Sequence, residues 1–98
     1  MVKHVILWKL KEGLADPSAV KADVKAGLES LKGVVPGLVE ISVRTEGLAS
    51  SNADMMLESV FASEAALKDY AVHPAHVAVA AGKVRPFVQA RLCLDYEV

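Results

Sequence analysis

The order of two hydrophobic periodicities along the chain is the feature that most restricts its fold. Apolar residues alternate with the period of a β-strand in four segments, at residues 2–10, 38–46, 54–61 and 87–98. After the first and third of these, apolar residues recur every three or four positions, as in an amphipathic helix. The predicted order is therefore βαββαβ. This order is typical of a ferredoxin-like α+β fold, with a four-stranded antiparallel sheet and both helices on one face.

The first predicted helix begins at an aspartate followed by a proline. Asp16 is a favourable N-cap, and Pro17 suits the first helical position because no partner is needed there for its missing N–H. We expect the helix to end at Gly33 or at the Pro36-Gly37 pair, before the second strand. Its apolar face would consist of Val20, Val24, Leu28, Leu31 and Val35.

The second predicted helix is short and interrupted. It begins at Ser63 and Glu64, and Pro74 should break it because the residue before a proline is pushed out of the helical conformation. A further helical turn or two at 74–81 can restart with Pro74 at its first position and end at Gly82.

Two of the predicted strands are apolar on both faces. In the third strand, Met55 and Leu57 lie on one face, while Met56 and Val60 lie on the other. The helices of a ferredoxin-like fold cover only one face of the sheet, so the second apolar face needs another partner. A second copy of the chain is the simplest one, because a twofold pairing requires a single self-complementary surface. We therefore expect a homodimer joined through the sheet face.

Chain length and charge exclude several classes of protein. The 98 residues suit one domain, which we assign to residues 1–98. Lys and Arg number 11 and Asp and Glu number 12, so there is no excess of charge to attract nucleic acid or an anionic membrane. No uncharged stretch is long enough to cross a bilayer, and the N-terminus does not resemble a secretion signal. We therefore expect a soluble, cytoplasmic protein that binds neither nucleic acid nor membranes.

The single cysteine, Cys93, excludes an intramolecular disulfide and a cysteine-rich zinc site. It alternates with Arg91 and Asp95 on the last predicted strand, and we interpret it as a small core residue. The chain also lacks a phosphate-binding glycine loop, a nucleophile elbow and a metalloprotease helix. We therefore expect no bound cofactor or metal.

Four polar side chains lie in apolar surroundings and are candidates for a functional site. His4 is on the apolar face of the first strand and Tyr70 is on the apolar side of the second helix, so packing in the core also explains both. His73 is a cap or an exposed residue at the helix break, whereas His76 lies within the following turns. A zinc site made of the three histidines is disfavoured, because Pro74 disrupts the helical spacing between two of them.

Two arginines, Arg44 and Arg91, could bind a carboxylate or a phenolate in a pocket. An exposed charge on a strand, or a charge between subunits, explains each of them equally well. The sequence alone does not separate these interpretations.

Two segments are more specific than these patterns. Residues 2–11 read VKHVILWKLK and residues 69–77 read DYAVHPAHV. Together with Asp95 and Tyr96 on the last strand, they resemble the stress-responsive A/B barrel family, also called Dabb, over essentially the whole chain. The resemblance implies a dimeric α+β barrel, which agrees with the predicted element order and the two-faced strands.

The resemblance also implies roles for three residues. Tyr70 and His76 match a tyrosine and a histidine that form the catalytic pair of the olivetolic acid cyclase-like members, which close a ring by an intramolecular aldol reaction. His4 matches a pocket histidine on the first strand. In such chemistry the histidine acts as a general base and the tyrosine hydroxyl polarises a carbonyl group. Met55 stands where these cyclases have a histidine, so their substrate specificity is not implied.

Three functional hypotheses follow. The first is a barrel that binds a small apolar or aromatic ligand and carries out His/Tyr acid–base chemistry, with His4 and His76 placed in apolar surroundings for that purpose. The second is a non-catalytic structural or stress-associated dimer, because fold membership does not transmit function. The third is a monooxygenase of the related dimeric barrel superfamily that needs little or no cofactor.

Overall fold

The computed structural model describes all 98 residues. Its helices and strands are β1 (Val2–Leu10), α1 (Pro17–Glu29), β2 (Leu38–Arg44), β3 (Met55–Phe61), α2 (Glu64–Val72), α3 (Pro74–Val79), a π-helical segment (Ala80–Val84), a 3-10 turn (Arg85–Phe87) and β4 (Val88–Glu97). Each predicted strand is present within two residues of its expected ends. None of the helices combines the length and the apolar composition needed to span a membrane.

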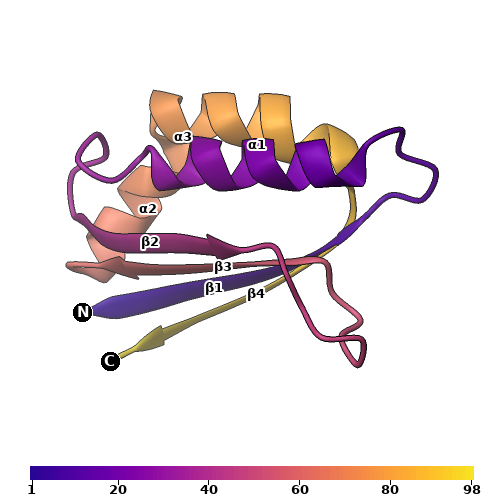
Figure 1. Cartoon of the computed structure of the whole chain (residues 1–98). Coiled ribbons are helices and arrows are strands. Elements are labelled where there is room, and N and C mark those ends of the chain that lie inside the picture. The colour runs from indigo at the N-terminus through magenta and orange to yellow at the C-terminus, as the bar shows by residue number, and fades with distance from the viewer.

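The four strands form one antiparallel sheet in the order β2-β3-β1-β4. The helices form a layer on one side of this sheet, and the other side carries no helix (Figure 1). The two chain ends lie next to each other, because the backbone N–H of Val98 donates a hydrogen bond to the carbonyl oxygen of Met1 (3.0 Å). The ferredoxin-like α+β fold predicted from the sequence is confirmed.

The hydrophobic core lies between the sheet and the helix layer. Alternate residues of β1 point into it, as the period of a strand requires, and they meet the apolar face of α1. Val24 of α1 and Phe61 of β3 are completely buried, and Leu28 is 2% exposed. Burial of an aliphatic or aromatic side chain of this size stabilises a fold by about 1.5–3 kcal/mol.

Both predicted N-caps are present. The Asp16 carboxylate accepts a hydrogen bond from the backbone N–H of Ala19 (3.1 Å), at the start of α1. The Ser63 hydroxyl accepts one from the backbone N–H of Ala66 (3.1 Å), at the start of α2. Each bond satisfies one of the N–H groups that a helix start leaves without a partner.

The end of α1 differs from the prediction. The helix ends at Glu29 rather than at Gly33 or at the Pro36-Gly37 pair. The hydroxyl of the next residue, Ser30, donates a hydrogen bond to the carbonyl oxygen three residues earlier (2.6 Å). The next two backbone hydrogen bonds also span three residues, so the chain continues in tighter turns. Two residues of the predicted apolar face lie beyond the helix and are still buried: Leu31 and Val35.

The prediction that the last helical turns end at Gly82 is wrong. Helical backbone continues from α3 through the π-helical segment to Arg85. Its wider turn leaves both Ala80 and Val84 buried, at 9% and 5% exposure. This burial offsets the unfavourable helix propensity of glycine, which is about 1 kcal/mol relative to alanine.

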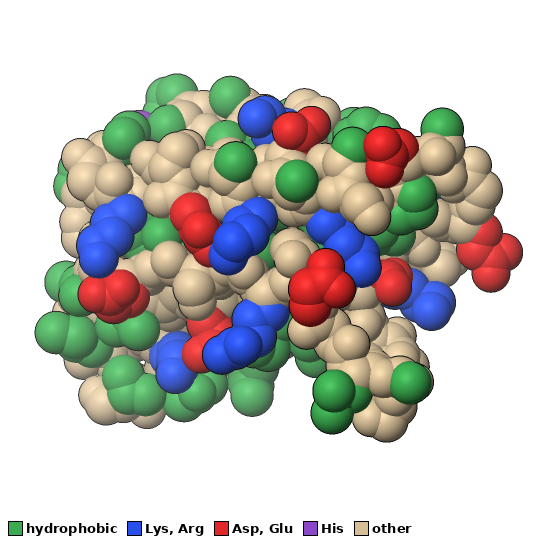
Figure 2. Space-filling view, in the orientation of Figure 1, with side chains coloured by type: hydrophobic (Ala, Val, Ile, Leu, Met, Phe, Trp, Pro, Cys, Tyr) green, Lys and Arg blue, Asp and Glu red, His purple; other side chains and the backbone are tan.

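The helix-free face of the sheet carries an apolar strip along β1 and β4, next to the ion pair of Lys3 with Glu58. The pairing register places Val5 opposite Leu94 and Leu7 opposite Leu92 on this face. Leu92 and Leu94 are 71% and 65% exposed, and Tyr96 of the same strand is 42% exposed. Hydrophobic side chains gather along the lower side of the molecule in Figure 2, where the sheet faces away from the helices. The chain alone therefore leaves a large apolar surface in contact with water.

Candidate active site

A cavity of about 560 Å³ lies on the helix side of the sheet, between β1, β4 and the helical segments that follow β3. Ile6 and Trp8 of β1 and Leu57 of β3 contribute to its apolar wall, because they alternate on the buried face of their strands. The polar side chains that line the cavity are His4, Tyr70, His76, Arg85, Gln89 and Arg91.

Tyr70 is the most buried of these polar residues. It follows Leu67 by three positions on α2, so both side chains lie on the helix face that packs against the sheet. Tyr70 is 1% exposed, and its hydroxyl has no hydrogen-bond partner. Burial raises the pKa of Tyr70 to about 12, although the charge of Arg91 opposes this change. At neutral pH the hydroxyl is therefore a protonated donor without an acceptor.

His76 lies directly beside Tyr70, with 4.1 Å between the ring centroids. Its Nδ1 is 3.3 Å from the carbonyl oxygen of Ala71. A carbonyl oxygen can only accept, so Nδ1 carries the proton and Nε2 keeps its lone pair. Burial lowers the pKa of His76; the bond to Ala71 opposes this, and the positive charges around the cavity lower the pKa further. His76 is therefore a neutral imidazole at neutral pH, with Nε2 able to accept a proton.

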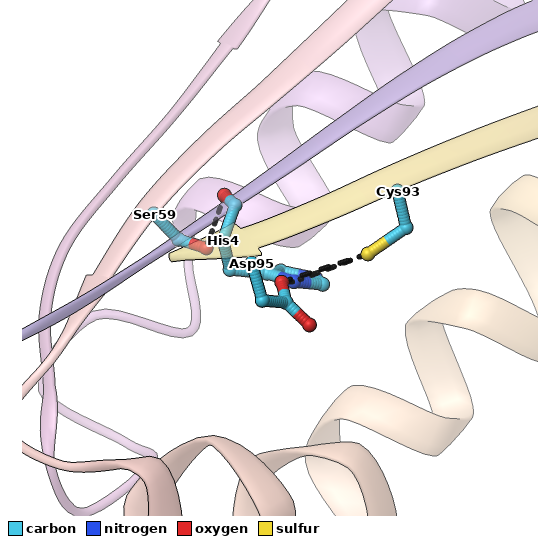
Figure 3. A network of polar contacts seen from close by, with 4 residues as sticks. All are labelled: His4, Ser59, Cys93 and Asp95. Carbon is cyan, nitrogen blue, oxygen red and sulfur yellow. Dashed lines mark hydrogen bonds and ion pairs between the residues drawn. The ribbon is translucent and has the colours of Figure 1, made fainter. Parts of the chain in front are cut away.

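His4 is held at the side of the cavity by an aspartate on the neighbouring strand. His4 and Asp95 lie opposite each other in the pairing of β1 with β4, and His4 Nδ1 is hydrogen-bonded to Asp95 Oδ1. Figure 3 shows these two side chains and that of Cys93 pointing toward one another. The His4 ring is 6% exposed and meets the rings of Phe61 and Tyr70 edge-on, with centroids 6.3 and 6.2 Å away. Asp95 thus fixes the orientation of the His4 ring.

The structure gathers three of the four candidate residues around one cavity. His4, Tyr70 and His76 all line it, although they come from β1, α2 and α3. His73 does not line it; this residue is the N-cap of α3, and its Nδ1 accepts a hydrogen bond from the backbone N–H two residues later (3.1 Å). The three histidines therefore do not form a common ligand set.

Of three other residues considered from the sequence, one lines the cavity and two do not. Arg91 lines the cavity, whereas Arg44 is an exposed residue of β2 outside it. Met55, which replaces the histidine of the cyclase-like proteins, is 2% exposed in the hydrophobic core and does not line the cavity.

The interpretation of Cys93 as a core residue is wrong. Its side chain is exposed, because β4 is the edge strand of the sheet and its outer end is not covered by the helix layer. Cys93 Sγ lies 3.5 Å from Asp95 Oδ1 and 3.7 Å from His4 Nδ1. Partial removal from water, and then the negative charge of Asp95, raise the pKa of the Cys93 thiol.

Three polar residues were not assigned to the site from the sequence. Arg85 and Gln89 line the cavity, and Asp95 orients His4. A polar side chain on every second residue of β4 was the available signal for Asp95, but the strand pattern does not show which β4 residue faces His4. No sequence pattern marks Arg85.

The family model of the stress-responsive A/B barrel domain matches residues 2–98. A comparison with curated proteins finds no match. The chain is similar to a solved dimeric protein of unknown function with a ferredoxin-like fold from Bacteroides fragilis, with 29% identity, a TM-score of 0.89, and coverage of 99% of this chain and 95% of that one.

Two plant proteins have a similar structure. The protein At3g17210 from Arabidopsis thaliana is 25% identical, with a TM-score of 0.83 and coverage of 100% of this chain and 95% of that one. A hydroxynitrile lyase from Passiflora edulis is 19% identical, with a TM-score of 0.79 and coverage of 97% and 90%. At 19% identity the likeness to the lyase shows the fold alone.

Proposed function

The chain belongs to the stress-responsive A/B barrel domain family, and we propose that it binds a small apolar or aromatic carbonyl compound in the cavity beside Tyr70 and His76. We further propose that these two residues carry out acid–base chemistry on this ligand. The observation that carries the proposal is the buried Tyr70 hydroxyl, which has no hydrogen-bond partner.

A buried polar group without a partner destabilises the folded protein by about 1–3 kcal/mol. The Tyr70 hydroxyl belongs to a side chain that lines the cavity, so the oxygen of a bound ligand is a suitable acceptor. The apolar wall around Trp8 would hold the hydrocarbon part of the ligand. A carbonyl oxygen suits this position, because the O–H of the protonated Tyr70 side chain needs an acceptor.

His76 supplies the second group that the chemistry needs. Its neutral Nε2 can remove a proton from the carbon next to the carbonyl, leaving the electron pair of that C–H bond in an enolate. Negative charge then develops on the carbonyl oxygen, where the Tyr70 hydroxyl donates its hydrogen bond. The enolate carbon can take the proton back or attack a second carbonyl group, which is the aldol closure implied by the resemblance. His4 would contribute to the cavity wall, in an orientation held by Asp95.

We also propose that the chain is a homodimer joined through the helix-free face of the sheet. Leu92 and Leu94 expose more than half of their surface on this face, and a second copy would cover them. The Bacteroides fragilis protein with the same fold is described as dimeric. A structural or stress-associated dimer without chemistry would use the same interface, so only experiments on the cavity separate the two functions.

The first experiment is a thermal-shift screen of the wild type with small phenols, β-keto acids and aromatic carboxylates. The variants are Tyr70→Phe and His76→Gln, and His73→Gln is the matched control because His73 lies outside the cavity. We expect a ligand to raise the midpoint of the wild type and the control, and to raise it less in both cavity variants. Light scattering checks that all four proteins have the same mass.

The second experiment uses proton NMR in deuterated water. It follows the replacement by deuterium of the hydrogen on the carbon next to the carbonyl group of that ligand. We expect the wild type and the control to catalyse exchange and His76→Gln to lose it. A ligand that binds all four proteins equally would place binding outside this site. The absence of any binding compound would favour the structural function, and oxygen uptake with an electron-rich phenol would favour the monooxygenase.

A further inference from the structure

Three side chains with different metal-binding atoms converge where β1 pairs with β4. His4 lies opposite Asp95 in this pairing, and Cys93 is two residues before Asp95 on the same face of β4. One nitrogen, one sulfur and one carboxylate oxygen thus lie within 4.8 Å of one another (Figure 3). The acid–base chemistry proposed above does not use Cys93.

Two of the three spacings between these atoms agree with a tetrahedral metal site. Zinc bonds of about 2.3 Å to sulfur and about 2.0–2.2 Å to nitrogen or oxygen place two ligand atoms about 3.5 Å apart. Cys93 Sγ is 3.7 Å from His4 Nδ1 and 3.5 Å from Asp95 Oδ1. The third pair, Nδ1 and Oδ1, is hydrogen-bonded and closer than this, so the two side chains would have to move apart for a metal ion to take the place of the shared proton.

The surroundings leave room for an ion and a fourth ligand. His4 is 6% exposed and is held in place by its surroundings, whereas the Asp95 side chain is 42% exposed and has room on its solvent side to adjust to an ion. A second cavity of about 560 Å³ opens next to all three residues. Four charged side chains also line it, two of each sign, so they neither strongly attract nor repel a cation: Lys68, Arg91, Glu64 and Glu97.

We propose that His4, Cys93 and Asp95 bind one zinc ion per chain, with a water molecule or another small ligand in the fourth position. The thiol loses its proton to solvent on binding, and the remaining imidazole proton resides on Nε2. The thiolate and the carboxylate then balance the charge of the ion. Zinc suits this mixture of nitrogen, sulfur and oxygen ligands, whereas Mg²⁺ and Ca²⁺ prefer oxygen alone.

Cobalt(II) provides the most specific test, because a thiolate bound to it produces a charge-transfer band in the near ultraviolet. Cys93 is the only cysteine, so any such band must come from this site. Wild-type protein is treated with a chelator, kept reduced with a non-thiol reductant, and titrated with Co²⁺. We expect the band to saturate at one ion per chain and to disappear when Zn²⁺ is added.

The variants Cys93→Ser and Asp95→Asn test the ligands, and His73→Gln is the control for adventitious binding to a surface histidine. We expect Zn²⁺ affinity, measured by competition with a chromophoric chelator, to fall at least about tenfold in both ligand variants and to be unchanged in the control. Circular dichroism checks that each variant is folded. The proposal is overturned if wild-type protein shows no charge-transfer band, or if folded Cys93→Ser binds Zn²⁺ as tightly as the wild type. An equal response to Mg²⁺ would also overturn it.

Discussion

Replacing Tyr70 by phenylalanine should stabilise the ligand-free protein. Deleting a buried hydroxyl that is hydrogen-bonded destabilises a protein by about 1 kcal/mol, because the bond is lost. The Tyr70 hydroxyl has no partner, so its deletion removes an unfavourable desolvation term of about 1–3 kcal/mol instead. The void left by one oxygen atom, about 10 Å³, offsets only about 0.2 kcal/mol of this gain. We therefore expect Tyr70→Phe to raise the free energy of unfolding by about 1–3 kcal/mol.

Urea unfolding of the two proteins at one protein concentration measures this change, since a dimer's stability depends on concentration. The single tryptophan, Trp8, is 4% exposed and reports on the core by its fluorescence. For a domain of this size, 1 kcal/mol corresponds to a rise in the thermal midpoint of about 4 °C.

A decrease of about 1 kcal/mol or more in the free energy of unfolding of Tyr70→Phe would refute this reasoning. It would mean that the hydroxyl has an acceptor in the folded protein. The argument that a ligand oxygen supplies the missing acceptor would then fail as well.

Three further predictions concern pH, backbone and assembly. Burial lowers the pKa of His76 below its usual value of 6.5, so the unfolded chain binds this proton more readily than the folded protein does. The free energy of unfolding should therefore decrease as the pH falls below about 6.5. Urea unfolding at pH 7.5 and 5.5 should show a smaller decrease in His76→Gln than in the wild type. Gly37 has a φ of +80° and a Cβ there would lie 2.6 Å from the Cβ of Ala66, whereas Gly33 has a φ of +84° and open space. Thermal unfolding should therefore show that Gly37→Ala lowers the free energy of unfolding by about 2–4 kcal/mol and Gly33→Ala by only about 1–2 kcal/mol. Equal decreases would contradict the close contact at Gly37. Leu94→Glu places a charge on the helix-free sheet face and should convert a dimer to a monomer in light scattering; an unchanged dimer mass would exclude this face as the interface.

Features that depend on neighbouring residues were predictable from the sequence. The four strands follow from period-two alternation, and the caps at Asp16 and Ser63 follow from the preference of short polar side chains for helix starts. Pro74 separates α2 from α3 as expected, because proline restricts the residue before it. These properties are local, so the chain segment itself contains the information.

The ends of the helices were less predictable, because several residues that can end a helix follow one another in the sequence. α1 ends at Glu29, where the chain passes into tighter turns before it reaches the glycine and proline residues expected to end the helix. Gly82 does not end the last helical segment, because tertiary packing of Ala80 and Val84 outweighs glycine's weak propensity. In both cases the outcome depends on a balance of about 1 kcal/mol, which composition does not resolve.

Some properties of the candidate site were also predictable from the sequence, and others depended on the tertiary structure. His4, Tyr70 and His76 could be named from the sequence, since each is a polar side chain in an apolar segment or in a family-like motif, and all three line the cavity. Three other properties could not be predicted from the sequence: the isolation of the Tyr70 hydroxyl, the tautomer of His76 and the exposure of Cys93. Each depends on which atoms of distant segments come within about 3.5 Å of one another. Asp95 is 91 residues from His4, and only the register between β1 and β4 makes them neighbours. A shift of that register by one residue would turn Asp95 and Cys93 to the opposite face of the sheet. Strand periodicity determines which residues share a face, whereas tertiary pairing decides which of them meet.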